Sequence, residues 1–381
     1  MIGYGHQYID EADIEAVVNV LKSDYLTQGP FVSKFEQEIC KITGAKYCVS
    51  VSNATAGLHI AVAALGLGYD AEGITTPNTF LASSNCMVYN HVKPVFADIN
   101  PASYNIDPAE IEKHITDKTK LLIPVHFAGL PCEMDKISVI AHKHNLHIIE
   151  DAAHAIGSQY ADGSYVGNCK YSDMTVFSFH PVKTITTGEG GAVTTNNESL
   201  YQKLLMLRSH GTTKNENLLS KNPGPWYYEM QALGFNYRMT DMQAALGYSQ
   251  LQKLDFFKRR RREIVAAYNK AFAGMQHLKT PVEPENVSSC FHLYAVQIDF
   301  SALGKSRTQV MQELRDKGIG TQVHYIPVHT QPFYKNTFGY KDGDYPVAET
   351  YYEQELSLPL YPGMSDEDVE NVIKAVKEVV E

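Results

Sequence analysis

The sequence predicts an α/β fold: a mostly parallel central sheet with helices on both faces, followed by a smaller C-terminal α+β domain. Continuous apolar runs rich in β-branched residues alternate with stretches of helical periodicity, as in buried parallel strands joined by helices. Near Met275 the composition turns to loop, with Pro281, Pro284 and Asn286, before strand and helix patterns resume. We therefore expect a large domain over residues 1–270, including an extended N-terminal lead-in, and a small domain over residues 271–381.

The composition narrows the class of protein. The chain has 381 residues, 44% of them hydrophobic and 20% charged, which is an ordinary globular balance. The net charge of −10 argues against a nucleic-acid binder, although an acidic protein can carry a locally positive pocket. Six cysteines without CxxC spacing predict a reduced, cytoplasmic enzyme rather than a disulfide framework or zinc site. We expect no membrane span and no signal peptide, because no apolar stretch is long enough and none precedes Asp10.

Two clusters of polar residues invite other interpretations. Lys258–Arg262 is the one basic block, and we interpret it as the solvated face of a long helix rather than a phosphate or partner contact. His142, His144 and His147 straddle an expected helix end and strand start. They would not share a face, so we expect no metal site.

The first half of the chain begins with a helix capped by Asp10 and continues with strands. Residues 47–51 predict a strand, and a helix follows from the small-residue turn 52–57, with Asn53 as its cap. The first N–H groups of that helix lack internal partners and would suit a phosphate, although a purely structural turn explains the same pattern. Further strands are expected near residues 73–80, 95–99, 121–126 and 147–149.

The second half adds helices and a second strand set. A long helix should start at Thr240, capped by Thr240 or Asp241, and a capped amphipathic helix should close the chain from Ser365. Other expected elements are helices at 198–209 and 308–317 and strands at 291–300 and 322–327.

The stretch from Met174 to Thr195 carries the chemistry. A strand-like run leads into Pro181, Lys183 follows in a threonine-rich turn, and a glycine-rich segment precedes a second strand. A lysine on a turn between two strands is a candidate for Schiff-base formation, because burial lowers its pKa toward the nucleophilic amine. The alternative is a solvated surface lysine. The glycines do not form a dinucleotide fingerprint, since Val193 occupies the third position and no helix follows, which excludes a nicotinamide-dependent dehydrogenase.

A second segment supplies an anion. The apolar run 147–149 ends in Glu150, Asp151, Ala152, Ala153 and His154, and open α/β sheets place ligand contacts at such strand ends. An amine, an anion for a ring nitrogen and donors for a phosphate together predict pyridoxal 5′-phosphate (PLP).

Three segments, IIEDAAHA, SFHPVKTITTGEGGAV and GFNYRMTDMQAALG, resemble the signature segments of the nucleotide-sugar aminotransferases of DegT type. The similarity covers nearly the whole chain, from GYGHQYIDEADI to the last helix, in the order of the family. It implies a PLP-dependent fold of the aspartate aminotransferase kind (fold type I) and a homodimer with shared active sites.

The resemblance also implies roles for individual residues. Lys183 would bind PLP and move a proton during the reaction, Asp151 would pair with the pyridinium, and His154 would lie near the ring or its phenolic oxygen. Phe80, otherwise a core residue, would stack on the ring, and Asn236, otherwise a cap, would reach the phosphate of the other subunit. The phosphate would also contact Thr55, Ala56 and Ser178. The implied substrate contacts are Tyr4, Asp24, Tyr25, Leu26, Thr27, Ala54, Gln322, His324 and Tyr325, with His324 equally explained as a structural histidine.

The substrate follows from a closer resemblance inside the family. Some members carry histidine at the lysine position and catalyse dehydration, so Lys183 implies transamination. PWYYEMQALGFNYRMTD and SFHPVKTITTGEGG are most similar to the transaminases of pseudaminic acid synthesis. This implies transfer from L-glutamate to C4 of a UDP-linked 4-keto-6-deoxy-N-acetylhexosamine, giving UDP-4-amino-4,6-dideoxy-N-acetyl-β-L-altrosamine. The alternatives are a GDP- or dTDP-linked 4-keto sugar, as in perosamine synthesis, and a PLP-binding regulatory protein without turnover.

Overall fold

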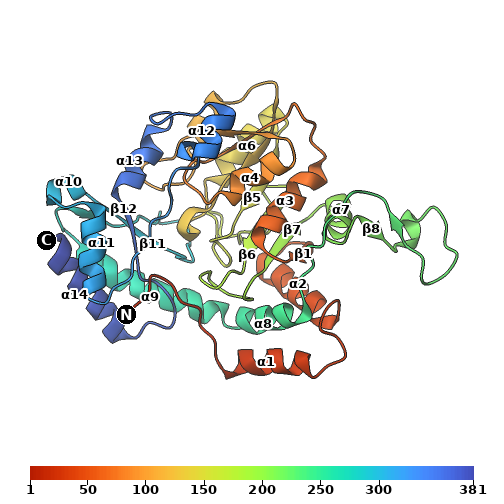
Figure 1. The fold of residues 1–381 in the computed structure, drawn as a ribbon, viewed down its shortest axis with the longest axis horizontal. Helices are drawn as coiled ribbons and strands as arrows, with labels where there is room; N and C mark the ends of the chain where they lie inside the picture. The colour runs from red at the N-terminus through yellow and green to blue at the C-terminus, as the bar shows by residue number, and fades with distance from the viewer.

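A seven-stranded sheet forms the centre of the computed structural model, which describes residues 1–381 (Figure 1). The strand order is β1-β7-β6-β5-β4-β2-β3. β7 is antiparallel to both of its neighbours, and every other pair is parallel, so the predicted mostly parallel sheet is confirmed. The strands are β1 (Tyr47–Val51), β2 (Glu72–Thr75), β3 (Lys93–Phe96), β4 (Thr119–Ile123), β5 (His147–Asp151), β6 (Met174–Ser178) and β7 (Gly191–Thr195).

Helices cover both faces of this sheet. Side chains alternate along each strand, so Leu121 and Ile123 face one core while Leu122 faces the other. The first core contains α3 (Ala54–Leu65), α4 (Ala82–Tyr89) and α7 (Glu198–Arg208). The second contains α2 (Pro30–Thr43), α5 (Pro108–Lys113), α6 (Met134–His144) and α8 (Asp241–Leu251). Burial on both faces explains why the strands are continuous apolar runs.

A smaller unit follows along α9 (Leu254–Phe272). Its antiparallel sheet has the order β10-β11-β12, and α11 (Arg307–Asp316) and α14 (Asp366–Val380) pack in the same core. α9 serves both units: Leu254 and Phe257 lie in the core of the large one, and Ile264 and Tyr268 lie in that of the small one. We propose residue 270 as the domain boundary, within this shared helix. The remaining elements are β10 (Leu278–Lys279), β11 (Tyr294–Ile298), α10 (Phe300–Leu303), α12 (Pro332–Phe338), α13 (Pro346–Gln354) and β12 (Glu355–Leu358).

Two local expectations about secondary structure are wrong. The long helix expected from Thr240 is two helices, α8 and α9, separated at Gln252–Lys253. The strand expected at 322–327 is absent: only Gln322 pairs, with Ser357. The ladder ends there because the N–H of His324 donates to a side chain, the Glu355 carboxylate, and Pro327 has no N–H to give.

The basic block also differs from its interpretation as a solvated face. Arg261 is only 1% exposed, and its guanidinium donates to the carbonyls of Phe291, His292 and Leu360. Helical periodicity turns Arg261 fully inward. Lys258, Arg260 and Arg262 are partly buried, and each also donates to a main-chain carbonyl.

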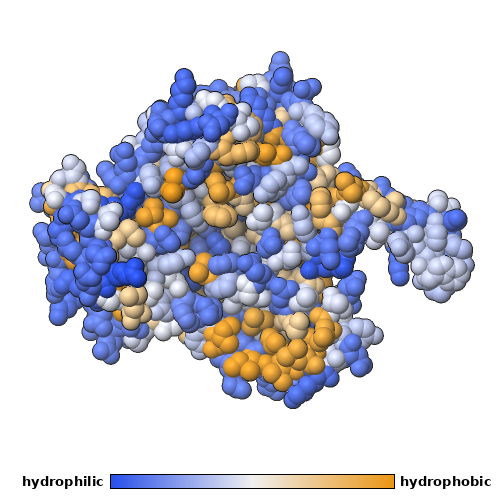
Figure 2. Space-filling model, in the orientation of Figure 1, coloured by the Kyte–Doolittle hydropathy of each residue, from blue (hydrophilic) through white to orange (hydrophobic).

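Two features stand out from the body. α1 (Glu11–Leu21) lies against the outer side of α8, and Ile14 (48%) and Leu21 (55%) remain exposed, so that Figure 2 shows an apolar patch over this helix. An arm around β8 (Thr212–Thr213) and β9 (Glu229–Met230) projects from the molecule and carries the exposed Trp226 (Figure 1).

No helix has both the length and the apolar character required to cross a membrane.

Candidate active site

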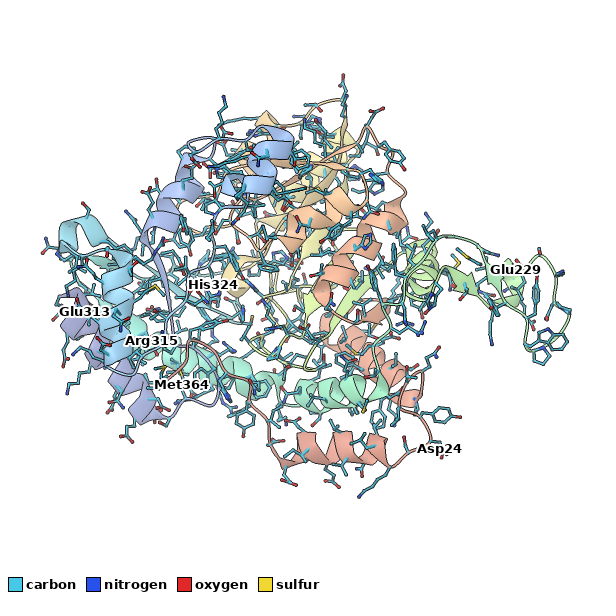
Figure 3. The ribbon with its side chains drawn as sticks, viewed as in Figure 1. Asp24, Glu229, Glu313, Arg315, His324 and Met364 are labelled. Atoms are coloured by element: carbon cyan, nitrogen blue, oxygen red, sulfur yellow. The ribbon has the colours of Figure 1, made fainter.

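A cavity of about 1150 Å³ opens at the carboxyl ends of the parallel strands, between the large and small units. Its walls come from β5, β6, the start of α3, the N-terminal segment and residues 322–325, and Figure 3 shows His324 in the interior of the molecule. The structure therefore gathers residues from distant parts of the chain. The expected site residues that line the cavity are Tyr4, Ala54, Thr55, Ala56, Phe80, Asp151, His154, Ser178, Lys183, Gln322, His324 and Tyr325.

Lys183 lies on the turn after β6, where its N–H donates to the carbonyl of His180 at 2.9 Å. Its side chain is half-buried and lines the cavity. Burial lowers the pKa of Lys183 to about 8, and the nearby Asp151 carboxylate opposes this shift. The neutral, nucleophilic fraction of this amine near neutral pH is therefore much larger than that of an ordinary lysine.

Asp151 ends β5 and is held by two donors. Ser83 Oγ donates to Oδ2 at 2.7 Å, and the N–H of Ala153 donates to Oδ1 at 3.0 Å. Ser83, from α4, escaped the sequence reasoning because a serine in a helix carries no distinguishing pattern. With its side chain almost fully buried, the carboxylate has a fixed orientation at the cavity wall.

The start of α3 presents unpaired N–H groups at the edge of the cavity. Asn53 caps the helix by accepting from the N–H of Ala56 at 2.8 Å, whereas the N–H groups of Ala54 and Thr55 have no acceptor in the chain. A Cβ at Gly191 would lie 2.7 Å from the nitrogen of Ala54, so glycine is what lets β7 approach the helix start. Unpaired N–H groups and the positive end of the helix dipole favour a phosphate here.

His154 has a defined tautomer. Its Nδ1 accepts from the N–H of Ala128 at 3.2 Å, so the neutral ring carries its proton on Nε2, which lies 3.1 Å from Tyr325 Oη. Burial, with the Lys183 charge as a smaller cause, holds the pKa of His154 well below its usual range. Because Nε2 donates to Tyr325, the hydroxyl proton of Tyr325 remains available to a ligand.

Two aromatic residues complete this wall. Phe80 is 58% exposed, so it is not the core residue that an aromatic after a strand often is, and its ring centroid lies 6.2 Å from that of Tyr325. His292 packs against His154 with ring centroids 4.4 Å apart, and its buried Nδ1 has no partner. Sequence reasoning missed His292, which lies in an apolar run without any marking pattern.

Five expected contacts do not line the cavity of this chain. Asp24, Tyr25, Leu26 and Thr27 form the turn between α1 and α2, where Thr27 pairs with Thr240. Figure 3 shows Asp24 at the edge of the molecule, far from His324. Asn236 is exposed and pairs with Ser209, although its neighbours Phe235 and Tyr237 line the cavity.

Other types of site have no support in the geometry. All six cysteines are free. No three His, Cys, Asp or Glu side chains are grouped so that they could hold a metal ion. The histidines at 142, 144 and 147 are separate: His147 Nδ1 lies 3.2 Å from Asp173, and His144 Nε2 lies 3.9 Å from Glu112.

The cavity combines a half-buried lysine, an oriented carboxylate and a helix start with free N–H groups for a phosphate. On this fold, that combination defines a PLP-dependent aminotransferase of fold type I. The model of the DegT/DnrJ/EryC1/StrS aminotransferase family matches residues 7–377, and the chain belongs to this family. It is therefore a PLP-dependent sugar aminotransferase.

Three named proteins resemble this chain over nearly its whole length, and two of them are described as aminotransferases. Spore coat polysaccharide biosynthesis protein SpsC of Bacillus subtilis is 43% identical, covering 99% of this chain and 96% of SpsC. PseC of Helicobacter pylori, an aminotransferase involved in the biosynthesis of pseudoaminic acid, superimposes with a TM-score of 0.90 at 32% identity, covering 100% and 99% of the two chains. The putative sugar aminotransferase Spr1654 of Streptococcus pneumoniae in its PLP form gives 0.92 at 32% identity, covering 100% and 98%.

Proposed function

We propose that this protein transfers an amino group from L-glutamate to C4 of a UDP-linked 4-keto-6-deoxy-N-acetylhexosamine, as a step toward pseudaminic acid. The observation that carries the substrate assignment is the similarity to PseC over the whole chain. The cavity of about 1150 Å³ is large enough for a nucleotide sugar beside the cofactor. A GDP- or dTDP-linked 4-keto sugar remains the second candidate, because a few residues decide which sugar fits.

The residues of the cavity divide into cofactor and substrate contacts. We assign Lys183 as the residue that binds PLP, Asp151 as the partner of its ring nitrogen and Phe80 as the aromatic residue on its face. The start of α3, with Thr55 and Ala56, and Ser178 would hold the phosphate, and His154 would lie beside the ring. PLP supplies the electron sink that makes removal of a proton from the amino donor accessible. Tyr4, Ala54, Gln322, His324 and Tyr325 are left for the substrate.

Side chains of the protein would transfer the protons of the reaction and stabilise its charges. Lys183, with a pKa lowered to about 8, has an amine that both accepts and returns a proton near neutral pH. Asp151 contributes a fixed negative charge and does not need to reorient, because Ser83 and Ala153 hold it. His324 and Tyr325, from the small unit, form one wall of the cavity.

We further propose a homodimer whose active sites are shared. Asn236 and Asp24–Thr27 would then complete the cavity of the partner subunit. The apolar patch over α1, which includes the exposed Ile14 and Leu21, supports this proposal, because such a patch marks an interface. The exposed Trp226 on the arm is a separate large side chain that could contact a partner. The six free cysteines support a reducing, cytoplasmic compartment.

The test is a turnover screen with L-glutamate and UDP-, dTDP- and GDP-linked 4-keto sugars. We expect the UDP-linked N-acetylhexosamine to give the highest kcat/KM. Higher kcat/KM with a GDP- or dTDP-linked sugar would replace the substrate assignment. A yellow holoenzyme that binds these sugars but neither bleaches with glutamate nor turns over would instead indicate a regulatory PLP-binding protein.

A further inference from the structure

A buried chain of side chains leads from the small unit to the cavity through Glu355, Ser357 and His324. His324 Nδ1 lies 2.8 Å from Ser357 Oγ, and Ser357 Oγ lies 2.5 Å from Glu355 Oε1. The second carboxyl oxygen, Oε2, accepts from the backbone N–H of His324 at 2.8 Å. Glu355 and Ser357 are fully buried on β12, and His324 lines the cavity. The remaining ring nitrogen, His324 Nε2, has no hydrogen-bond partner in the chain and is the one available to a ligand.

The backbone around these residues is fixed. Ser357 and Gln322 exchange two backbone hydrogen bonds, of 2.8 and 3.2 Å, which hold the segment that carries His324 against β12. Arg307 of α11 donates to the main-chain carbonyl of Glu355 rather than to its carboxyl group. The carboxyl group therefore has only the N–H of His324 and the Ser357 hydroxyl as partners.

Several titratable groups face Glu355. They are Arg307 from α11, Tyr351 from α13, and His324 and Tyr325 from the cavity segment. Burial raises the pKa of Glu355 to about 8. Burial and the charge of Lys183 lower the pKa of His324 to about 3, so an added proton resides on Glu355 rather than on the imidazole.

Only two arrangements of the protons satisfy every hydrogen bond between Glu355, Ser357 and His324. With Glu355 ionised, Ser357 donates to the carboxylate and must accept from His324 Nδ1–H, which leaves a lone pair on Nε2. With Glu355 protonated, the carboxyl O–H donates to Ser357, Ser357 donates to Nδ1, and Nε2 carries the proton. The two arrangements differ by one bound proton and by the type of hydrogen bond that His324 offers to the cavity.

We propose that Glu355 and Ser357 are positioning residues that select the tautomer of His324, and so decide whether its Nε2 donates or accepts a hydrogen bond to the sugar substrate. At neutral pH the protonated arrangement presents Nε2–H to a sugar oxygen. Above the pKa of Glu355, Nε2 becomes an acceptor and this contact is lost. The link to the sugar rests on the proposed function, whereas the link between Glu355 and the tautomer does not.

The Glu355→Gln variant provides a sharp test. The N–H of His324 needs an acceptor, so the amide oxygen must take the place of Oε2 and the amide NH₂ must face Ser357. Glutamine therefore imitates the protonated carboxyl group at every pH. Ser357→Ala removes the link altogether. Glu353→Gln, at an exposed position near the end of the preceding helix α13, is the matched control.

The first measurement is the pH dependence of the His324 ring nitrogens by NMR of holoenzyme labelled with ¹⁵N-histidine, with signals assigned from His324→Asn. In the wild-type protein and Glu353→Gln, the proton should move from Nε2 to Nδ1 as the pH rises through the pKa of Glu355. In Glu355→Gln it should stay on Nε2, and in Ser357→Ala the tautomer should no longer follow Glu355. An unchanged wild-type tautomer across this range, or a Glu355→Gln variant that still switches, would overturn the proposal.

The second measurement is KM for the nucleotide sugar across the same range. KM of the wild-type enzyme should rise about three- to ten-fold on the alkaline side, the effect of one lost hydrogen bond. This rise should be reduced in Glu355→Gln, while kcat keeps its pH dependence because Lys183 is present in both proteins. An identical dependence of KM on pH in the wild-type enzyme and in Glu355→Gln would rule out the contact between His324 Nε2 and the sugar. Absence of turnover with every sugar would defeat the proposed function but leave the NMR result valid.

Discussion

The Asp151 carboxylate and the Lys183 amine line one cavity because they follow neighbouring parallel strands. Asp151 is the last residue of β5, and Lys183 lies on the turn after β6. Parallel pairing brings both strand ends to the same edge of the sheet. Burial lowers the pKa of Lys183, and the Asp151 carboxylate opposes part of this shift, so the two groups are electrostatically linked.

Lys183→Ala should abolish transamination and leave the fold intact. The variant loses both the residue that would bind PLP and the amine that moves protons, so we expect kcat to fall by at least about 10²–10⁴-fold. Steady-state kinetics and circular dichroism measure the two parts of this prediction. Lys374→Ala, an exposed position on α14, is the control. Retained turnover in Lys183→Ala would remove the role assigned to this residue.

Asp151→Asn should lower kcat with little effect on stability. The amide oxygen can keep the N–H of Ala153, and the amide NH₂ can donate to the Ser83 hydroxyl, which accepts as well as donates, but the charge opposite the ring nitrogen is lost. The loss of a buried charge partner is worth about 3–5 kcal/mol, so kcat should fall by about 10²–10⁴-fold. Asp135→Asn, on the exposed side of α6, should change nothing. Near-normal kcat in Asp151→Asn would argue against a pyridinium partner at this position.

Mixed dimers test the shared active site. If Lys183 acts with Asn236 of the partner subunit, a heterodimer of Lys183→Ala and Asn236→Ala chains contains one intact site and one doubly altered site. Random mixing of equal amounts should then restore about a quarter of the wild-type activity. Each variant alone, refolded or incubated in the same way, is the control. No recovery, despite subunit exchange verified by mass, would mean that both residues act within one chain.

The stability of the cofactor-free protein should depend on pH through Lys183. Its folded pKa is lowered to about 8 from 10.5, so the unfolded chain binds more protons between these values. The free energy of unfolding attributable to Lys183 therefore rises as the pH increases from about 8 to 10.5, by about 3 kcal/mol at most. Urea unfolding of the wild-type protein and of Lys183→Met across this range measures the difference. An equal pH dependence in both would show that burial does not perturb this amine.

Local patterns in the sequence determined most of the fold. Alternation of apolar runs and helical periodicity located the strands of the central sheet. Asp10, Asn53, Thr240 and Ser365 cap the helices that were expected to begin beside them. A cap acts on N–H groups two or three residues away, and periodicity repeats within a few residues, so both signals are complete in a short stretch of chain.

Only the tertiary structure decided which partners these residues have. Ser83 orients Asp151 across 68 residues, Glu355 reaches the N–H of His324 across 31, and Arg261 is buried against carbonyls of the small unit. It also placed Asp24–Thr27 outside the cavity of their own chain. Hydrogen bonds between distant residues, and the burial of each side chain, depend on how the elements pack. The residues next to each partner in the sequence do not predict that packing. The amino-acid sequence by itself thus determined the elements and the position of the candidate lysine, whereas packing decided the burial, the pKa shifts and the orientations of the groups around it.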